Sequence, residues 1–201
     1  MALISSKPLG TLIRVADSDG GQWDANYEIA DINNFVSGGV VLVRKNIHSK
    51  SVFGSANAYP GGTLDNKMTS IYNSLPEKLQ SKIMDATFAL EGGGSITRKV
   101  FALTYTMAGF GANNGTTEGK ALQHYNSNAN RIKTYNGSAG LWWLASQRTS
   151  DYVWLVSWDG SVYTYGIPLS NSYGFVPAFI LPSKISYDPT PNADGSYNLI
   201  L

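Results

Sequence analysis

The stretch WWLASQRTSDYVWLVSWDGSVYTY (residues 142–165) decides the fold class of this chain. Aromatic and β-branched residues dominate it, and such runs, when bounded by turn residues, are typical of β-strands. The Asp159-Gly160 pair predicts a two-residue hairpin turn of the Asp-Gly type between two of these runs. The expected strands are residues 142–145, 152–158 and 161–165. The C-terminal half is therefore predicted to be mostly antiparallel β.

The N-terminal segment shows a similar pattern. Residues 9–16 and 27–32 are predicted to pair as a hairpin, because the turn-forming residues 17–21 (DSDGG) lie between them. Residues 40–44 (VVLVR) form a nearly continuous apolar run after two glycines, which is typical of a buried strand. We therefore expect residues 1–45 to form a small sheet.

The hydrophobic period changes to three and four residues between residues 63 and 87, and this period predicts two short helices. Thr63 and Ser74 are the expected caps of the two helix starts, and the break between the helices is expected near Ser74. Pro76 fits the first turn of the second helix, where a missing N–H costs nothing.

The remaining segments are predicted to be strands and loops. Residues 100–105 (VFALTY) are an expected strand, and the Gly-, Asn-, Ser- and Thr-rich chain that follows up to Gly140 is typical of loops. One short helix is expected within it, at residues 118–125. A last strand is expected at residues 175–181, and the polar, proline-containing tail 188–201 is expected to be extended or poorly ordered.

Composition narrows the function classes. A chain of 201 residues with 43% hydrophobic content is long enough for one well-packed domain. A net charge of +1 with 14% charged residues provides no field to attract nucleic acid or an acidic membrane surface. The first ten residues lack a signal-peptide pattern, and no segment approaches the ~20 apolar residues of a membrane span. We expect synthesis in the cytoplasm without membrane insertion.

Several motifs, taken in order, resemble a known family. They are Trp142-Trp143-Leu144 with Ser146, the hairpin VSWDGSVY (156–163), and SNSYGFVPAF (170–179). These resemble an uncharacterised domain family of phage and Gram-positive bacterial genomes whose fold is similar to C-type lectins and formylglycine-generating enzymes. The similarity spans most of the chain, because LGTLIRV, VVLVRK, the two-helix block, KVFALTY and TTEGKAL occur in the expected order. The resemblance implies an α+β, C-type-lectin-like single domain over residues 1–201, with residues 100–182 as core sheet and binding loops.

Two positions depart from the family pattern. The family usually has arginine where this chain has Ala145 and Val176. If those arginines form a buried polar network, apolar packing replaces it here, and such a replacement is close to neutral when all partners change together. A function that depends on the arginines would not be retained.

The known chemistries of this fold find little support. Formylglycine-generating enzymes depend on cysteines, and this chain has none. Calcium-dependent lectins use Glu-Pro-Asn or Gln-Pro-Asp and Trp-Asn-Asp motifs, and none of these tripeptides occurs. Asp17, Asp19 and Glu28 have part of an EF-hand spacing, but Gly21 and Gln22 stand where a ligand and an obligatory glycine belong. We therefore expect no metal and no cofactor.

Other catalytic groups are also not indicated. His48 and His124 have no metal-like spacing, so a surface or capping role is expected. The acidic residues are scattered, and no glycosidase pair is evident. An enzyme acting on cell-wall sugars becomes a possibility only if Asp151 or Asp159 faces another acid across a cleft.

The expected binding surface is aromatic. Tyrosine and tryptophan offer rigid contact area, and Ser, Asn and Gly offer adaptable hydrogen bonds, a mixture typical of paratopes. Alternation along residues 152–158 places Val153 and Leu155 on one face and the tryptophans on the other, which we expect to face outward. Trp142, Trp143 and Phe179 are expected in the core. The predicted ligand-binding residues are Tyr152, Trp154, Trp158, Tyr163, Tyr165, Asn171 and Tyr173.

The resemblance implies a non-enzymatic bacteriophage virion protein at a tail tip, a fibre or the capsid exterior, with other virion proteins as partners and a homo-oligomeric state. It binds a host-surface glycan or protein through the aromatic surface. The alternative is a structural decoration or baseplate protein whose aromatic patch packs against another virion subunit. Exposure of the patch in the assembled particle distinguishes the two.

Overall fold

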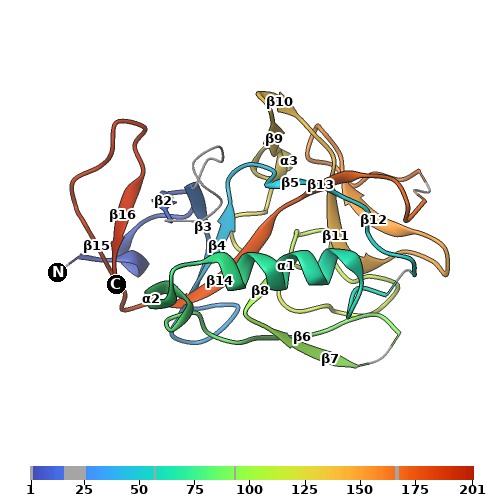
Figure 1. Cartoon of the computed structure of the whole chain (residues 1–201), viewed down its shortest axis with the longest axis horizontal. Helices are drawn as coiled ribbons and strands as arrows, with labels where there is room; N and C mark the ends of the chain where they lie inside the picture. Colours follow the sequence, from blue (N-terminus) through green and yellow to red (C-terminus); the bar gives the residue numbers. More distant parts are fainter. Residues whose placement is uncertain (1, 16–25, 57, 93, 166–167) are drawn as a thin grey trace.

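The computed structural model describes residues 2–15, 26–56, 58–92, 94–165 and 168–201. Antiparallel strands dominate this part of the chain, and its helices are short, so the fold is broadly α+β. Figure 1 shows helix α1 (Thr63–Ser74) lying across the strands β14 (Pro177–Pro182) and β8 (Val100–Ala102). A second sheet lies at the far end of the molecule from the two termini.

The larger sheet has eight strands in the order β1-β15-β16-β2-β3-β4-β14-β8. All neighbouring strands are antiparallel except the parallel pair β16–β2. The six strands not yet bounded are β1 (Ala2–Leu3), β15 (Ser186–Tyr187), β16 (Tyr197–Ile200), β2 (Leu12–Arg14), β3 (Asn26–Ile32) and β4 (Gly39–Arg44).

The second sheet has four strands in the order β12-β11-β13-β5. Strand β11 is its centre, antiparallel to β12 and parallel to β13. Their bounds are Val153–Val156 for β12, Trp142–Gln147 for β11, Tyr173–Phe175 for β13 and Ser49–Ser51 for β5. Two small hairpins complete the β structure: β6 (Ala86–Ala89) with β7 (Ser95–Arg98), and β9 (Thr134–Tyr135) with β10 (Ser138–Ala139).

The predicted helix pair is confirmed, with shorter bounds and different caps. Helix α2 (Glu77–Gln80) is a single turn, and Met84 already bridges to Ile180 in the large sheet. Gly62 and Pro76 occupy the two cap positions without a side-chain bond. The Ser74 hydroxyl instead donates to a carbonyl of its own helix. The expected caps were wrong, because glycine and proline, which have no side-chain hydrogen-bonding group, stand at the two cap positions.

The third α-helix lies outside the predicted interval. Residues 118–125 form no helix, whereas α3 spans Asn128–Arg131. Glu118 is buried and accepts a hydrogen bond from Ser146, so this segment is fixed by tertiary contacts rather than by its own backbone ladder. A short 3-10 turn, η1 (Ile4–Ser6), follows β1.

Strand pairing corrects the expected arrangement of the chain ends. The strands β2, β3 and β4 do not form a separate small sheet, because β4 pairs with β14 over five residue pairs. The tail is not merely extended, since β16 pairs with both β15 and β2. The turn residues 17–21 lie outside the described residues, although β2 and β3 pair as expected on either side of them.

The core lies on both faces of strand β11. Trp143 packs with Phe53, Val153 and the buried face of α1, while Trp142 packs with the loop residues on the other side. Successive strand residues point to opposite faces, and each of these two tryptophans fills one of them. Both are fully buried, as is Phe179, which confirms the prediction that the three belong to the core.

Candidate functional site

The turn after β12 differs in detail from the predicted two-residue form. The Gly160 N–H donates to the Ser157 carbonyl at 3.0 Å, and the Ser157 N–H donates to the Ser161 carbonyl at 2.8 Å. A type I′ turn needs positive φ at both central residues, but of Asp159 and Gly160 only the glycine has it, at +78°. Residues 161–165 then contribute one isolated bridge, Val156–Val162, rather than a strand.

This turn is docked on helix α3. The Arg131 Nε donates to the Gly160 carbonyl at 2.8 Å. A Cβ at Gly160 would lie 1.9 Å from the Asn128 carbonyl oxygen, so no other residue fits without moving the backbone. The turn therefore presents Trp158, which is 61% exposed, from a fixed position.

Three of the predicted ligand-binding aromatics are exposed. Tyr165 is 72% exposed and Tyr152 is 39% exposed, in addition to Trp158. Tyr163 is half-buried, and its ring lies 5.5 Å from that of Tyr165. We call these four residues, of which Tyr152 directly precedes strand β12 and the other three follow it, the exposed aromatic surface.

Trp154 lies on the other face of the second sheet. Its Nε1 donates to the Asn113 side-chain oxygen at 2.9 Å, and the Tyr105 ring and the Arg148 guanidinium each lie 4.8 Å from its ring. Tyr163, by contrast, packs against the core cluster that contains Leu155. The expectation that Trp154 and Tyr163 share one outward face was therefore wrong, because their side chains pack against different core clusters on opposite faces of the sheet.

The last two predicted residues lie on and before strand β13. Tyr173 is half-buried with its ring edge against Trp143 at 5.3 Å, whereas Asn171 is exposed. The predicted set is thus divided between two faces of one sheet. Alternation along the sequence could not reveal this division, because it does not say which loops cover each face.

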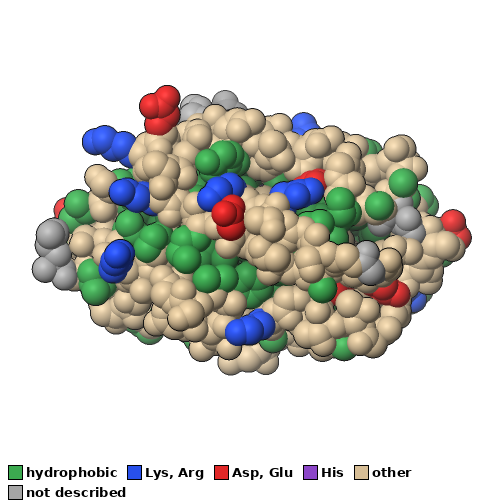
Figure 2. All heavy atoms as spheres, turned by 90° about the horizontal axis from the view of Figure 1, so that it is seen from below, with side chains coloured by type: hydrophobic (Ala, Val, Ile, Leu, Met, Phe, Trp, Pro, Cys, Tyr) green, Lys and Arg blue, Asp and Glu red, His purple; other side chains and the backbone are tan. Residues whose placement is uncertain are grey.

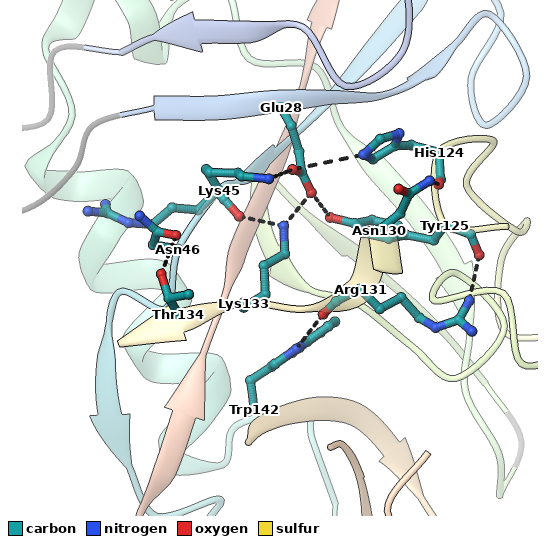
Figure 3. A network of polar contacts seen from close by, with 11 residues as sticks. Glu28, Lys45, Asn46, His124, Tyr125, Asn130, Arg131, Lys133, Thr134 and Trp142 are labelled. Carbon is teal, nitrogen blue, oxygen red and sulfur yellow. Dashed lines mark hydrogen bonds and ion pairs between the residues drawn. The ribbon is translucent and has the colours of Figure 1, made fainter. Parts of the chain in front are cut away.

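A buried polar network anchors the long loop between β8 and β11 (Figure 3). Tyr125 donates to Glu28 Oε1 at 2.6 Å, and the fully buried Lys133 ammonium bonds to the same oxygen. Lys45 and His124 approach the other carboxylate oxygen at 3.4 Å and 3.9 Å. Burial alone would raise the pKa of Glu28, but the charge and hydrogen bond of Lys133 hold it below its usual value.

This network removes Glu28 from any calcium site. Both of its carboxylate oxygens face side chains of the chain itself, as Figure 3 shows. Asp17 and Asp19, the other two acids of the partial EF-hand spacing, lie outside the described residues. Within the described ranges, no group of three His, Asp or Glu side chains is placed to hold a metal ion.

The two histidines are less exposed than expected. His48 is buried, with its ring 5.2 Å from that of Phe175, and a surface role for it was wrong. His124 is largely buried beside Glu28, and this burial lowers its pKa. Neither position could be predicted from spacing, because both depend on residues distant in the sequence.

Arg131 forms a second centre of the same network. Its guanidinium donates to the carbonyls of Tyr125 at 2.8 Å and Ala108 at 3.2 Å, and to the Asn128 side chain at 2.5 Å. Its own carbonyl accepts from the Trp142 indole at 3.1 Å. One side chain therefore connects the loop, the start of α3 and the turn below Trp158. Sequence reasoning missed this role, because the acceptors are backbone carbonyls that leave no motif.

The neighbouring β9–β10 hairpin could have been predicted from the local sequence. Asn136 and Gly137 join β9 to β10, and both have positive φ, at 50° and 81°. Asn-Gly is the preferred pair for such a type I′ turn. The hairpin lies within the region expected to be loop.

The positions that depart from the resembled family are both buried. Val176 packs in the loop-side core cluster, and Ala145 packs in the cluster beneath α1. Apolar side chains thus occupy both positions.

The acids singled out in the sequence are exposed. Asp151 accepts a hydrogen bond from Ser150, and Asp159 accepts two from Ser161. Two other acids do lie together, since the Glu118 carboxylate accepts from the backbone N–H of Glu91 at 2.9 Å. Sequence reasoning did not pair these two residues, which are 27 positions apart.

Among the described residues, no helix is long and apolar enough to cross a membrane. Comparisons with protein-family models, curated proteins and solved structures found no match for this chain.

Proposed function

We propose that this chain is a non-enzymatic bacteriophage virion protein that binds a host-surface glycan or protein through the exposed aromatic surface. The observation that carries the proposal is the exposure of Trp158 and Tyr165, at 61% and 72%, together with the fixed position of the turn that contains Trp158, which Arg131 binds at the Gly160 carbonyl. Large aromatic side chains left in water on a fixed support are typical of interaction sites. The C-type-lectin-like assignment belongs to the same proposal and is supported by the order of the sequence motifs.

The location of the exposed aromatic surface favours its display on the outside of a particle. Figure 1 shows both termini at one end of the molecule and strand β12 at the other. A carrier protein bound near the termini would leave the exposed aromatic surface free. The proposal therefore requires no rearrangement of the domain on assembly.

The low charge of the chain favours a neutral ligand. On the face of the molecule seen in Figure 2, charged side chains are scattered among neutral polar and apolar groups. The whole chain carries a net charge of +1. Recognition would then depend on stacking and hydrogen bonds, which are less sensitive to salt than ion pairing.

The test compares two double variants. Trp158→Ala/Tyr165→Ala removes the two most exposed aromatics, and Leu9→Ala/Ile200→Ala removes exposed apolar side chains outside the surface. Fluorescently labelled protein is applied to a glycan array and to a panel of Gram-positive cells. We expect the wild type and the control to bind equally and the aromatic variant to bind at least about tenfold more weakly.

Equal binding by both variants would overturn the proposal. So would a structure of the native particle in which a neighbouring subunit buries Trp158 and Tyr165. That second result would instead support the structural alternative, a decoration or baseplate protein whose aromatic patch is an assembly contact.

A further inference from the structure

A cleft of about 420 Å³ lies on the molecule between the β6–β7 hairpin and the segment that precedes α1. None of the residues of the exposed aromatic surface lines it. Its volume falls in the range of about 300–1,000 Å³ that is usual for small-molecule sites. The cleft is therefore large enough for a small ligand distinct from the one proposed above.

The space in this cleft depends on Ala145. This residue is buried at the wall of the cleft, on the central strand β11, with Gln147 two positions further along the same face. Any larger side chain at residue 145 would extend into the cleft. One wall of the cleft is thus a small side chain on a strand, while the segment before α1, the β6–β7 turn and Glu118 of the long loop supply the other walls.

The polar lining carries negative charge. Glu91 and Glu118 both line the cleft, and none of the lining residues in the described ranges is basic. Neither glutamate takes part in an ion pair between described residues. Asn114 donates to both carboxylate oxygens of Glu91 at 2.8 Å, which holds this carboxylate in place without neutralising it.

Glu118 lies in the same negatively charged part of the cleft. Burial raises its pKa, and the charge of Glu91 acts in the same direction. Its hydrogen bonds come from the Ser146 hydroxyl, the Glu91 backbone and the Asn113 side chain, which are all neutral donors. A cation in the cleft would relieve the repulsion between the two carboxyl groups.

The rest of the lining is apolar. Pro60, Leu90 and Ile96 provide aliphatic walls beside the two glutamates. An ion with only a hydration shell gains nothing from such walls, whereas a short hydrocarbon stem buries apolar area against them. From this combination we propose that the cleft binds a small organic cation, an ammonium or guanidinium group on a short aliphatic stem, with Glu91 as its main ionic partner.

The proposal is tested with n-butylammonium as the probe and n-butanol as its neutral match. Each is titrated into ¹⁵N-labelled full-length protein, and the dissociation constant is read from amide shifts of Ile96 and Gln147. We expect n-butylammonium to bind at least about tenfold more tightly than n-butanol, a difference of about 1.4 kcal/mol.

Two variants and one control locate the site. Glu91→Gln keeps the size of the side chain and removes the charge, and we expect the preference for n-butylammonium over n-butanol to fall at least about fivefold. Ala145→Arg places a guanidinium of the chain itself in the cleft and should abolish binding. Asp151→Asn neutralises an exposed carboxylate outside the lining and should change nothing.

Equal affinities for n-butylammonium and n-butanol would overturn the proposal, as would an unchanged preference in Glu91→Gln. These outcomes are independent of the glycan and cell-binding test, because the variants and probes do not touch the exposed aromatic surface.

Discussion

The buried polar network and the exposed aromatic surface reverse the usual placement of side chains. Glu28, Lys133 and Arg131 carry charge and are buried, whereas Trp158 and Tyr165 are aromatic and lie in water. Each buried charge has partners within the chain, but the indole of Trp158 is left 61% exposed. The two regions meet at the turn, where Arg131 donates a hydrogen bond to the Gly160 carbonyl.

This contrast indicates a division of roles. Buried charges are costly unless they are paired, so the network is sensitive to the loss of any one partner. Exposed aromatic side chains contribute little to the stability of the folded state. Substitutions of the buried network residues should therefore lower the stability of the folded protein, and substitutions of Trp158 and Tyr165 should alter binding with little effect on stability.

The largest effect is expected at Lys133. Lys133→Met leaves the buried Glu28 carboxylate without its main cationic partner, which should lower the free energy of unfolding by about 3–5 kcal/mol. Lys45→Met is the matched control, because Lys45 also pairs with Glu28 but is 46% exposed. Urea unfolding at pH 7 measures both. A similar small loss in the two variants would show that the network does not hold the loop.

The next effect concerns the contact between the two regions. Gly160→Ala forces a Cβ against the Asn128 carbonyl and should cost about 1–3 kcal/mol of unfolding free energy. Gly38→Ala is its control, since Gly38 also has positive φ, at +73°, but no atom lies within 4 Å of its added Cβ. Urea midpoints that fall equally in both variants would mean that only backbone strain matters and that the turn is not docked.

A smaller effect is expected on acidification. Burial lowers the pKa of His124 below 6.5, so the unfolded chain takes up its proton first and stability is lost as the pH falls below about 6.5. The lowered pKa of Glu28 acts in the same direction at lower pH, with stability lost as the pH falls through its folded value. The raised pKa of Glu118 acts in the opposite direction.

His124→Gln isolates the histidine contribution to this pH dependence. The difference in unfolding free energy between the wild type and this variant should shrink from pH 7 to pH 5, by less than the loss in Gly160→Ala. A difference that stays constant over this range would exclude a titrating role for His124.

The smallest effect on stability is expected at the exposed aromatic surface. Trp158→Ala should change the free energy of unfolding by no more than about 0.5 kcal/mol, because the side chain is mostly in water. Thermal unfolding of the variant beside Trp142→Ala, which empties a fully buried site, gives the contrast. A loss above about 1 kcal/mol would place Trp158 in the folded framework and weaken its assignment to binding.

Local sequence determined much of the framework. The buried strand at residues 40–44 and the helix pair were predicted because each depends on periodicity within a few residues. A turn at Asp159-Gly160 was also predicted, although its two-residue form and the strand expected after it were wrong. The core positions of Trp142, Trp143 and Phe179 followed from the same patterns. The helix predicted at residues 118–125 was wrong, because tertiary hydrogen bonds fix this segment in a non-helical form.

Only the tertiary structure decided which aromatics are available to a ligand. Alternation showed that Trp154 and Leu155 face opposite ways, but not that Tyr105 and Arg148 cover the Trp154 side. The same holds for Glu28, whose partners Tyr125 and Lys133 are 97 and 105 residues away along the chain. Local patterns fix the direction in which a side chain points, whereas its burial and charge depend on segments that meet it only after folding.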